Sequence, residues 1–171
     1  MSGAINQMQM AYAAEEDRIL FRVNSTEKQE FRFWITRRYA LLMLAVLSKH
    51  SDSDPDVTTQ ENPEAKRAVQ SFKQEKAINE ANFEKKFEDA ANEQPLGEDA
   101  QLAFKLNYNI QNENLHLGIQ PKTGKGINMV ISREINSSLT QLLLSAAKKG
   151  DWRLKSTLSV SPPNAETRVV N

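Results

Sequence analysis

The chain of 171 residues contains no cysteine. This absence excludes disulfides, thiolate metal sites and cysteine nucleophiles together. Apolar runs are short, and none approaches the ~18 residues that a membrane-spanning helix needs. The N-terminal stretch MSGAINQMQMAYAAEEDR has no basic region followed by a long apolar segment, so we predict neither a signal peptide nor a membrane anchor. We therefore expect a cytoplasmic protein with no membrane partner, stabilised by an ordinary apolar core.

Two stretches resemble ligand-binding loops without completing either motif. The stretch 118–125 resembles a phosphate-binding loop, but its glycines are one residue too far apart, and a strand pattern follows where a helix is needed. Three aspartates at alternate positions from Asp52 to Asp56 resemble the opening of a calcium loop, but Pro63 stands where the bidentate glutamate is required. A hairpin turn and a polar linker explain the two stretches better.

The two histidines, His50 and His116, stand alone in the sequence, and no serine lies in a G-x-S-x-G elbow. His116 falls on the outer face of a predicted strand, which indicates a surface histidine rather than a metal ligand or a general base. We therefore expect a protein that is not an enzyme and that holds no metal and no cofactor.

The sequence does contain a pattern that occurs twice. Residues 17–48 and 113–144 align without a gap at a spacing of ninety-six residues. The apolar positions coincide: Ile19, Phe21 and Val23 fall on Leu115, Leu117 and Ile119, and Phe31, Phe33 and Ile35 fall on Ile127, Met129 and Ile131. The same spacing aligns Met8, Met10 and Tyr12 with Phe104, Leu106 and Tyr108. Because few residues are identical, the pattern indicates a repeated topology without proving common ancestry.

Each copy of the pattern predicts three strands followed by a helix. In the first copy, period-two alternation and then helical spacing predict strands over 5–13, 18–23 and 30–36 and a helix over 37–49, with Thr36 as its N-cap. In the second copy they predict strands over 101–110, 114–120 and 126–132 and a helix over 135–149, which Gly150 ends. We therefore predict an α+β fold of two tandem βββα units related by a pseudo-twofold axis.

The rest of the chain divides around these units. We expect the first unit over 1–50, a linker and an acidic helix over 51–99, the second unit over 100–150 and a tail over 151–171, together forming one compact domain. Asn62-Pro63-Glu64 predicts a helix start. We favour a long surface helix that reaches Ala91 and packs at its two ends; the alternative is a break near Lys76 and Asn79, which interrupt its apolar stripe. Its apolar stripe would contain Ala65, Ala68, Val69, Phe72, Phe83 and Phe87. In the tail, Trp152, Leu154 and Leu158 are expected to lie on the core.

Charge is distributed unevenly although the formal net charge is zero. Residues 1–49 carry seven Lys or Arg against five Asp or Glu, residues 50–99 carry six against thirteen, and residues 100–171 carry nine against four. Both units are thus mildly basic and the segment between them is acidic. This asymmetry indicates either a face that binds polyanions or an acidic helix that neutralises the units on which it packs, and we favour the second interpretation.

The outer face of the first predicted sheet carries the residues with the most functional content. Arg22, Arg32 and Trp34 lie opposite the apolar Phe21 and Phe33, and an aromatic ring flanked by guanidinium groups is suited to stacking on unpaired bases. The alternative is that the other unit or the acidic helix covers this face and that Trp34 belongs to the core. We favour cover, because the second copy has Gly118, Asn128 and Val130 at the matching positions.

A strand-rich unit closed by a helix and repeated in one chain resembles the PUR-type and Whirly-type single-stranded nucleic-acid-binding proteins, over most of Met8 to Leu144. Those families have four strands before the helix, where this sequence predicts three. The resemblance implies single-stranded nucleic acid as a partner. The stretches RILFRVN and EFRFWITRR also resemble small bacterial proteins, a resemblance that implies no activity.

Two functions follow as expectations. The first is a non-enzymatic interaction module whose partner is another protein or a second copy of the chain, which would form a homodimer through strand or helix pairing. The alternative is a single-stranded nucleic-acid-binding protein that uses Arg22, Arg32, Trp34 and Lys105.

Overall fold

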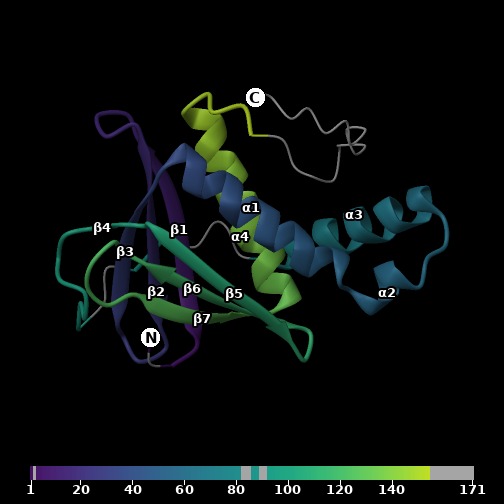
Figure 1. Cartoon of the computed structure of the whole chain (residues 1–171), viewed down its shortest axis with the longest axis horizontal. Helices are drawn as coiled ribbons and strands as arrows, with labels where there is room; N and C mark the ends of the chain where they lie inside the picture. The colour runs from purple at the N-terminus through teal and green to yellow at the C-terminus, as the bar shows by residue number, and fades with distance from the viewer. Residues whose placement is uncertain (2, 82–85, 89–91, 155–171) are drawn as a thin grey trace, which may run out of the picture.

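The computed structural model of the chain describes residues 1, 3–81, 86–88 and 92–154, and within them the fold is α+β, as predicted (Figure 1). The first sheet contains, in spatial order, β1 (Ile5–Ala13), β2 (Arg18–Ser25), β3 (Glu30–Ile35) and β4 (Gln101–Leu102). The second contains β5 (Lys105–Gln111), β6 (Asn114–Gln120) and β7 (Ile127–Ile131). The helices are α1 (Arg37–Asp52), α2 (Pro55–Thr58), α3 (Pro63–Glu80) and α4 (Arg133–Lys149).

The predicted strands and closing helices lie close to their expected positions because local signals define them. Period-two alternation places Ile19, Phe21 and Val23 on the inner face of the first sheet, where all three are fully buried. At the start of α1 the hydroxyl of Thr36 accepts a hydrogen bond from the backbone N–H of Tyr39, and Ser132 does the same at the start of α4. Gly150 is the C-cap of α4, as predicted.

The spacing of ninety-six residues relates equivalent cross-strand pairs in the second and third strands of the two units. Phe21 lies opposite Phe33 between β2 and β3, and Leu117 lies opposite Met129 between β6 and β7. The first strands do not follow the same spacing: Phe21 faces Met10, whereas Leu117 faces Tyr108 rather than Leu106. The sequence alignment of these strands was therefore wrong by two residues, because the hairpin between β5 and β6 is two residues shorter than the one between β1 and β2.

The predicted strand over 101–110 is in fact two strands that belong to different sheets. β4 pairs in parallel with β3, with Leu102 opposite Trp34. The N–H of Ala103 then donates to the carbonyl of Trp34 at 3.0 Å, and the N–H of Phe104 donates to the carbonyl of Gln120 at 2.9 Å. The chain thus passes directly from the first sheet to the second.

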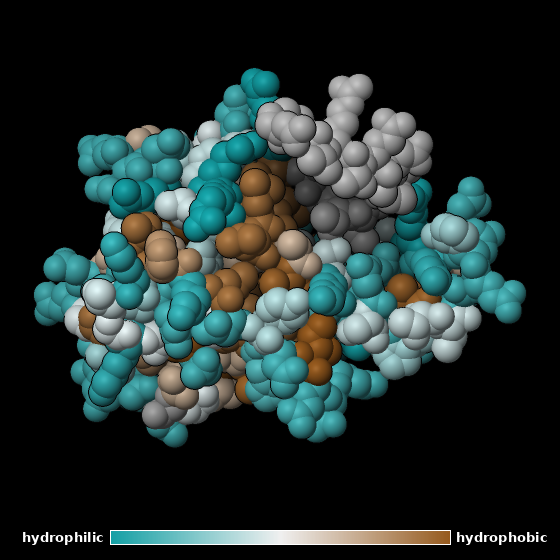
Figure 2. All heavy atoms as spheres, viewed as in Figure 1, coloured by the Kyte–Doolittle hydropathy of each residue, from teal (hydrophilic) through white to brown (hydrophobic). Residues whose placement is uncertain are grey.

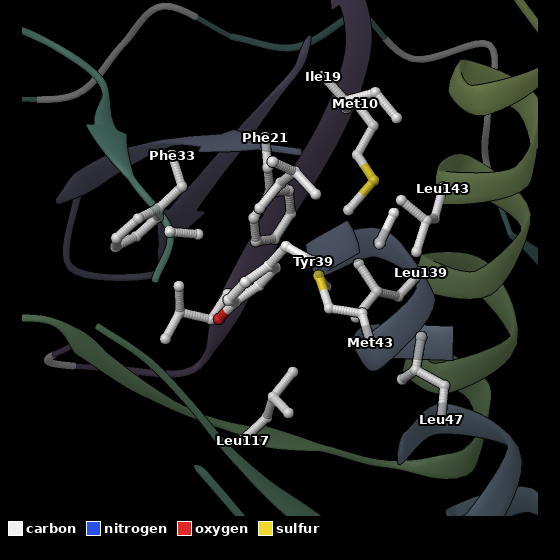
Figure 3. Close-up of a cluster of buried hydrophobic side chains, with 14 of the residues drawn as sticks. Met10, Ile19, Phe21, Phe33, Tyr39, Met43, Leu47, Leu117, Leu139 and Leu143 are labelled. Atoms are coloured by element: carbon white, nitrogen blue, oxygen red, sulfur yellow. The ribbon is translucent and has the colours of Figure 1, made fainter. Parts of the chain in front are cut away.

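One apolar cluster joins both sheets to α1 and α4. Figure 3 shows Tyr39 and Met43 of α1 between Phe21 of β2, Leu117 of β6 and Leu139 of α4. Full burial of each such side chain contributes about 1.5–3 kcal/mol of transfer free energy. The two sheets therefore share one core and one pair of helices.

The segment between the units differs from the sequence prediction. The predicted linker after Ser51 contains the end of α1 and the short helix α2. Helix α3 begins at Pro63 with Asn62 as its N-cap, as predicted. It ends at Glu80, close to the alternative break near Lys76 and Asn79, rather than at the favoured Ala91. The predicted apolar stripe is wrong at Phe72, which is 69% exposed, whereas Ala65 and Val69 are half-buried. Phe83 lies outside the described residues. Helix α3 packs against α2 and α4 and projects to one side of the molecule (Figure 1).

The residues that follow α4 lie on the core as predicted. Trp152 is buried, and its ring meets that of Tyr12 edge to face at a centroid distance of 6.0 Å. Leu154 packs against the same core, while Leu158 lies outside the described residues. None of the helices in the described part of the chain combines the length and the apolarity needed to cross a bilayer.

Candidate interaction surface

The structure brings three of the four candidate residues together. Arg22, Arg32 and Trp34 share the outer face of the first sheet, opposite the core, and each is half-buried. Lys105 lies at the start of β5 in the second sheet, so it is not part of the face that carries the two arginines and Trp34. The candidate surface is therefore the outer face of β1 to β4.

A buried carboxylate holds the two arginines of this face. Glu30 is only 2% exposed, and its Oε1 accepts from Nε of Arg22 at 2.8 Å and from Nε of Arg32 at 2.7 Å. Burial alone would raise the pKa of Glu30, but the hydrogen bonds and charges of the two arginines outweigh burial and lower that pKa. Sequence reasoning missed Glu30, although its position two residues before Arg32 in the strand places both on one face.

Both guanidinium groups have further contacts. Arg22 stacks on the ring of Phe87, with its Cζ 4.3 Å from the ring centroid, a geometry of cation–π attraction. Arg32 donates from Nη1 to the carbonyl of Glu98 at 3.0 Å. The two arginines are thus fixed by partners within the chain.

A piece of the acidic segment lies on one end of the outer face. The side-chain oxygen of Gln7 accepts from the N–H of Glu88 at 3.0 Å, and its amide nitrogen donates to the carbonyl of Lys86 at 3.4 Å. Asn24 donates to the carbonyl of Glu88 at 3.5 Å. The expectation that the acidic segment covers this face is therefore met in part. Within the described residues, 86–88 lie beside Gln7 and Asn24 and reach Arg22 through Phe87, and Glu98 meets Arg32, whereas Trp34 stays half-buried.

The other end of the face carries an apolar row with one residue from each strand. Cross-strand pairing places these four neighbours side by side: Ala11, Leu20, Trp34 and Leu102, called here the Trp34 row. Leu102 is 42% exposed, Ala11 is exposed, and Leu20 and Trp34 are half-buried. Sequence reasoning found Trp34 but missed the row. The pairing of β4 with β3 places Leu102 beside Trp34, although the two residues are 68 positions apart in the chain.

A second cluster of polar side chains lies among the four helices. His50 is fully buried; its Nδ1 accepts from the amide of Asn136 at 2.8 Å, so its Nε2 carries the proton and donates to the carbonyl of Glu113 at 2.9 Å. Burial lowers the pKa of His50 and outweighs the backbone hydrogen bond. Both ring nitrogens are therefore occupied in holding α1 to α4 and to the β5–β6 turn.

The same cluster contains a buried carboxylate. Asp54, the N-cap of α2, accepts from Nζ of Lys73 at 2.8 and 2.9 Å and lies 3.6 Å from Nε of Arg133. Burial would raise the pKa of Asp54, but the contacts with Lys73 and Arg133 lower it overall. These groups border a cavity of about 240 Å³ between the four helices.

The contacts of this cluster favour a structural role. Arg133 donates to the carbonyls of His50 and Ser53, at 3.0 and 3.4 Å, and Lys73 also pairs with Asp56. Within the described residues, no three His, Asp or Glu side chains are grouped so that they could hold a metal ion. The charged groups satisfy one another, so the cluster fastens α2 and α3 to α1 and α4.

A further apolar surface lies over the helices. Leu41 and Leu42 of α1 are both more than two-fifths exposed. Figure 2 shows apolar side chains gathered in the middle of the face on which Figure 1 places α1 and α4. The molecule therefore presents exposed apolar side chains on more than one face.

Comparison of the chain with protein-family models, with curated proteins and with solved structures gave no match. The comparison with solved structures thus adds no support to the resemblance with PUR-type and Whirly-type proteins.

Proposed function

We propose that the chain is a non-enzymatic protein-interaction module that acts in the cytoplasm and binds an apolar segment of a partner protein on the Trp34 row. The observation that carries this proposal is the row itself, in which Leu20, Trp34 and Leu102 form a contiguous apolar strip on the outer face of a sheet. Aromatic residues are enriched at the centres of protein interfaces, where they supply much of the binding free energy.

The contacts of Arg22 and Arg32 favour a protein over a nucleic acid. Single-strand binders combine stacking rings with cationic groups that neutralise phosphates. Here Glu30 accepts hydrogen bonds from both arginines and offsets part of their charge. Lys105, which the alternative function also requires, lies in the other sheet.

As part of the same proposal, the two βββα units are copies of one ancestral unit related by a pseudo-twofold axis. The supporting observations are their identical order of elements, the equivalent pairs Phe21–Phe33 and Leu117–Met129, and the matching caps Thr36 and Ser132. The Trp34 row distinguishes the copies, because the second sheet has Gly118 opposite Asn128 and His116 opposite Val130 on its outer face. The proposed partner site thus belongs to the first copy.

Site-specific photocrosslinking tests the partner site. A photoreactive amino acid at Leu102 is expected to capture a protein in the cells from which the chain comes. Val130 is the matched control, since it is 52% exposed on the outer face of the second sheet. Equal capture of the same proteins from both positions, or no protein adduct from position 102, would contradict the proposal.

Binding of single-stranded nucleic acid is the second candidate, favoured by the half-buried Trp34 beside two guanidinium groups. Titration with a single-stranded oligonucleotide at low salt, followed by tryptophan fluorescence, separates the candidates. We expect no quenching. Quenching that salt weakens and that Trp34→Phe abolishes would favour the nucleic acid, because the other tryptophan, Trp152, is buried.

A further inference from the structure

We infer that β5 is a self-association edge, and that two copies of the chain form a dimer by antiparallel pairing of their β5 strands about Tyr108. Within the described residues β5 pairs with β6 and lies at the end of its sheet. Five of its seven residues are exposed. This inference rests on the second sheet and does not depend on what binds the Trp34 row.

The β5–β6 turn determines which backbone groups of β5 face away from β6. Asn112 and Glu113 form a two-residue turn in which both residues have positive φ, 50° and 66°. This is a type I′ hairpin, whose closing pair exchanges both backbone hydrogen bonds. The pair Gln111–Asn114 and every second residue before it therefore bond to β6. The N–H and C=O groups of Leu106, Tyr108 and Ile110 point to the outer edge.

The sequence of β5, KLNYNIQ, lacks the usual protection of an edge strand. Natural sheets keep such edges apart with charged side chains, proline or bulges. Here the only charged side chain is that of Lys105 at the first position, and the other polar side chains are those of Asn107, Asn109 and Gln111. Seven residues of regular strand are long enough to pair with a second strand.

One register matches all seven residues of both strands. Antiparallel pairing centred on Tyr108 places Leu106 opposite Ile110, Asn107 opposite Asn109 and Lys105 opposite Gln111. In this register the outward N–H and C=O groups of Leu106, Tyr108 and Ile110 lie opposite the same groups of the second strand, as antiparallel pairing requires. The two Lys105 residues lie six positions apart along the strands, about 20 Å, so they do not repel one another at close range.

Pairing in this register would also cover exposed apolar surface. Tyr108 and Leu42 are each 43% exposed. Leu42 lies seven residues before Lys49 on the same face of α1, and Nζ of Lys49 donates to the Tyr108 hydroxyl at 3.0 Å. The apolar residues beside the edge are thus on the side of the sheet that α1 packs against. Because Lys49 contacts Tyr108, the central residue of the register, the two copies bring like charges toward the dimer axis, and added salt is expected to tighten the dimer.

A single introduced cysteine tests the pairing, because the natural chain has none. In the proposed register the two copies of position 108 form a hydrogen-bonded pair with Cα atoms about 5.5 Å apart, which a disulfide can span. Under mild oxidation Tyr108→Cys is expected to give a disulfide-linked dimer at least tenfold faster than Val130→Cys, which lies on the exposed face of the opposite edge strand. Equal rates would overturn the inference.

Charged residues introduced at positions 107 and 109 test the register without relying on a disulfide. The double variant Asn107→Lys with Asn109→Lys places lysines opposite each other and is expected to weaken the dimer at least tenfold in sedimentation equilibrium, with an unchanged circular dichroism spectrum. The control Asn107→Lys with Asn109→Glu places opposite charges together and is expected to restore association to within about threefold of wild type. A wild type that stays at 19.4 kDa at high concentration, or a double-lysine variant that stays dimeric, would overturn the inference.

Discussion

Glu30 is nearly fully buried on the outer face of the first sheet and receives one hydrogen bond from each of two arginines. Replacing Glu30 by Gln would leave both guanidinium groups beside a neutral amide. We expect this change to lower the free energy of unfolding by about 1–3 kcal/mol, the usual cost of breaking a buried charge-assisted network. The measurement is denaturation by urea at pH 7.

The matched control for this prediction is Glu16→Gln, which removes a carboxylate that pairs with Arg18 on the exposed surface at 3.6 Å. Exposed pairs contribute little, so the control should leave stability nearly unchanged. Equal effects of the two substitutions would contradict the structural role of Glu30. Because the pKa of Glu30 is lowered in the fold, its contribution to stability is present above the ordinary pKa of the carboxyl, 4.5, and is lost as the pH falls further.

His50 gives a second prediction at the residue scale. Its pKa is lowered by burial, so the unfolded chain binds a proton before the folded protein does. Stability should therefore decline as the pH falls from about 7 through 6.5, the ordinary pKa of the histidine, and on to its lowered value. In His50→Gln this decline should be absent. Unfolding of the wild type and of His50→Gln, measured at several pH values between 7 and 5, tests this, and an equal decline in both proteins would contradict it.

At the scale of elements, the carboxylate of Asp54 contributes to the attachment of both α2 and α3. Asp54 caps α2 and pairs with Lys73 of α3. We expect Asp54→Ala to accelerate amide hydrogen exchange in α2 and α3 by at least tenfold while exchange in β2 and β6 stays slow. Such a difference indicates local opening. Uniform acceleration in all elements, or none in α3, would contradict the claim that the polar cluster holds α2 and α3 against α1 and α4.

Asn62→Ala serves as the control for that prediction. Asn62 also caps a helix start, with its side chain accepting from the N–H of Glu64 at 2.8 Å, but it is exposed. Its loss should fray the first turn of α3 and cost about 1 kcal/mol of helix stability, with little effect on α2.

Local sequence signals predicted most of the elements. Alternation and caps predicted β1 to β3, α1 and α4 within a few residues, because these features depend on neighbours in the chain. The favoured end of α3 and its packing were predicted wrongly: the stripe containing Phe72 follows helical spacing, yet α3 packs by contacts that leave Phe72 exposed. Periodicity shows which residues share a face and does not show whether a neighbour covers it.

Features that join distant segments could not be predicted. The pairing of Trp34 with Leu102 and the hydrogen bond of His50 with Asn136 connect residues 68 and 86 positions apart. The candidate residues Arg22, Arg32 and Trp34 were correctly placed on one face by alternation. The ion pairs of the two arginines were missed, because Glu30 was not considered as their partner.

At the scale of the whole molecule, two sheets share α1, α4 and one core, and each sheet presents a different surface. The first sheet carries the Trp34 row on its outer face, and the second presents the edge of β5. These surfaces lie on different sheets, so a dimer formed through β5 would leave the Trp34 row of each copy available. Such a dimer would bind its partner with two equivalent sites and gain avidity toward a repeated or dimeric partner.

The affinity of the captured partner for the wild-type chain and for Trp34→Ala tests the central claim most directly. The partner is the protein crosslinked at position 102, purified and titrated by calorimetry at physiological salt. Loss of a buried aromatic contact of about 1.5–3 kcal/mol predicts an affinity about 10- to 150-fold weaker, with an unchanged circular dichroism spectrum because Trp34 lies outside the core cluster. An affinity that Trp34→Ala leaves unchanged would contradict the assignment of the Trp34 row as the interaction surface.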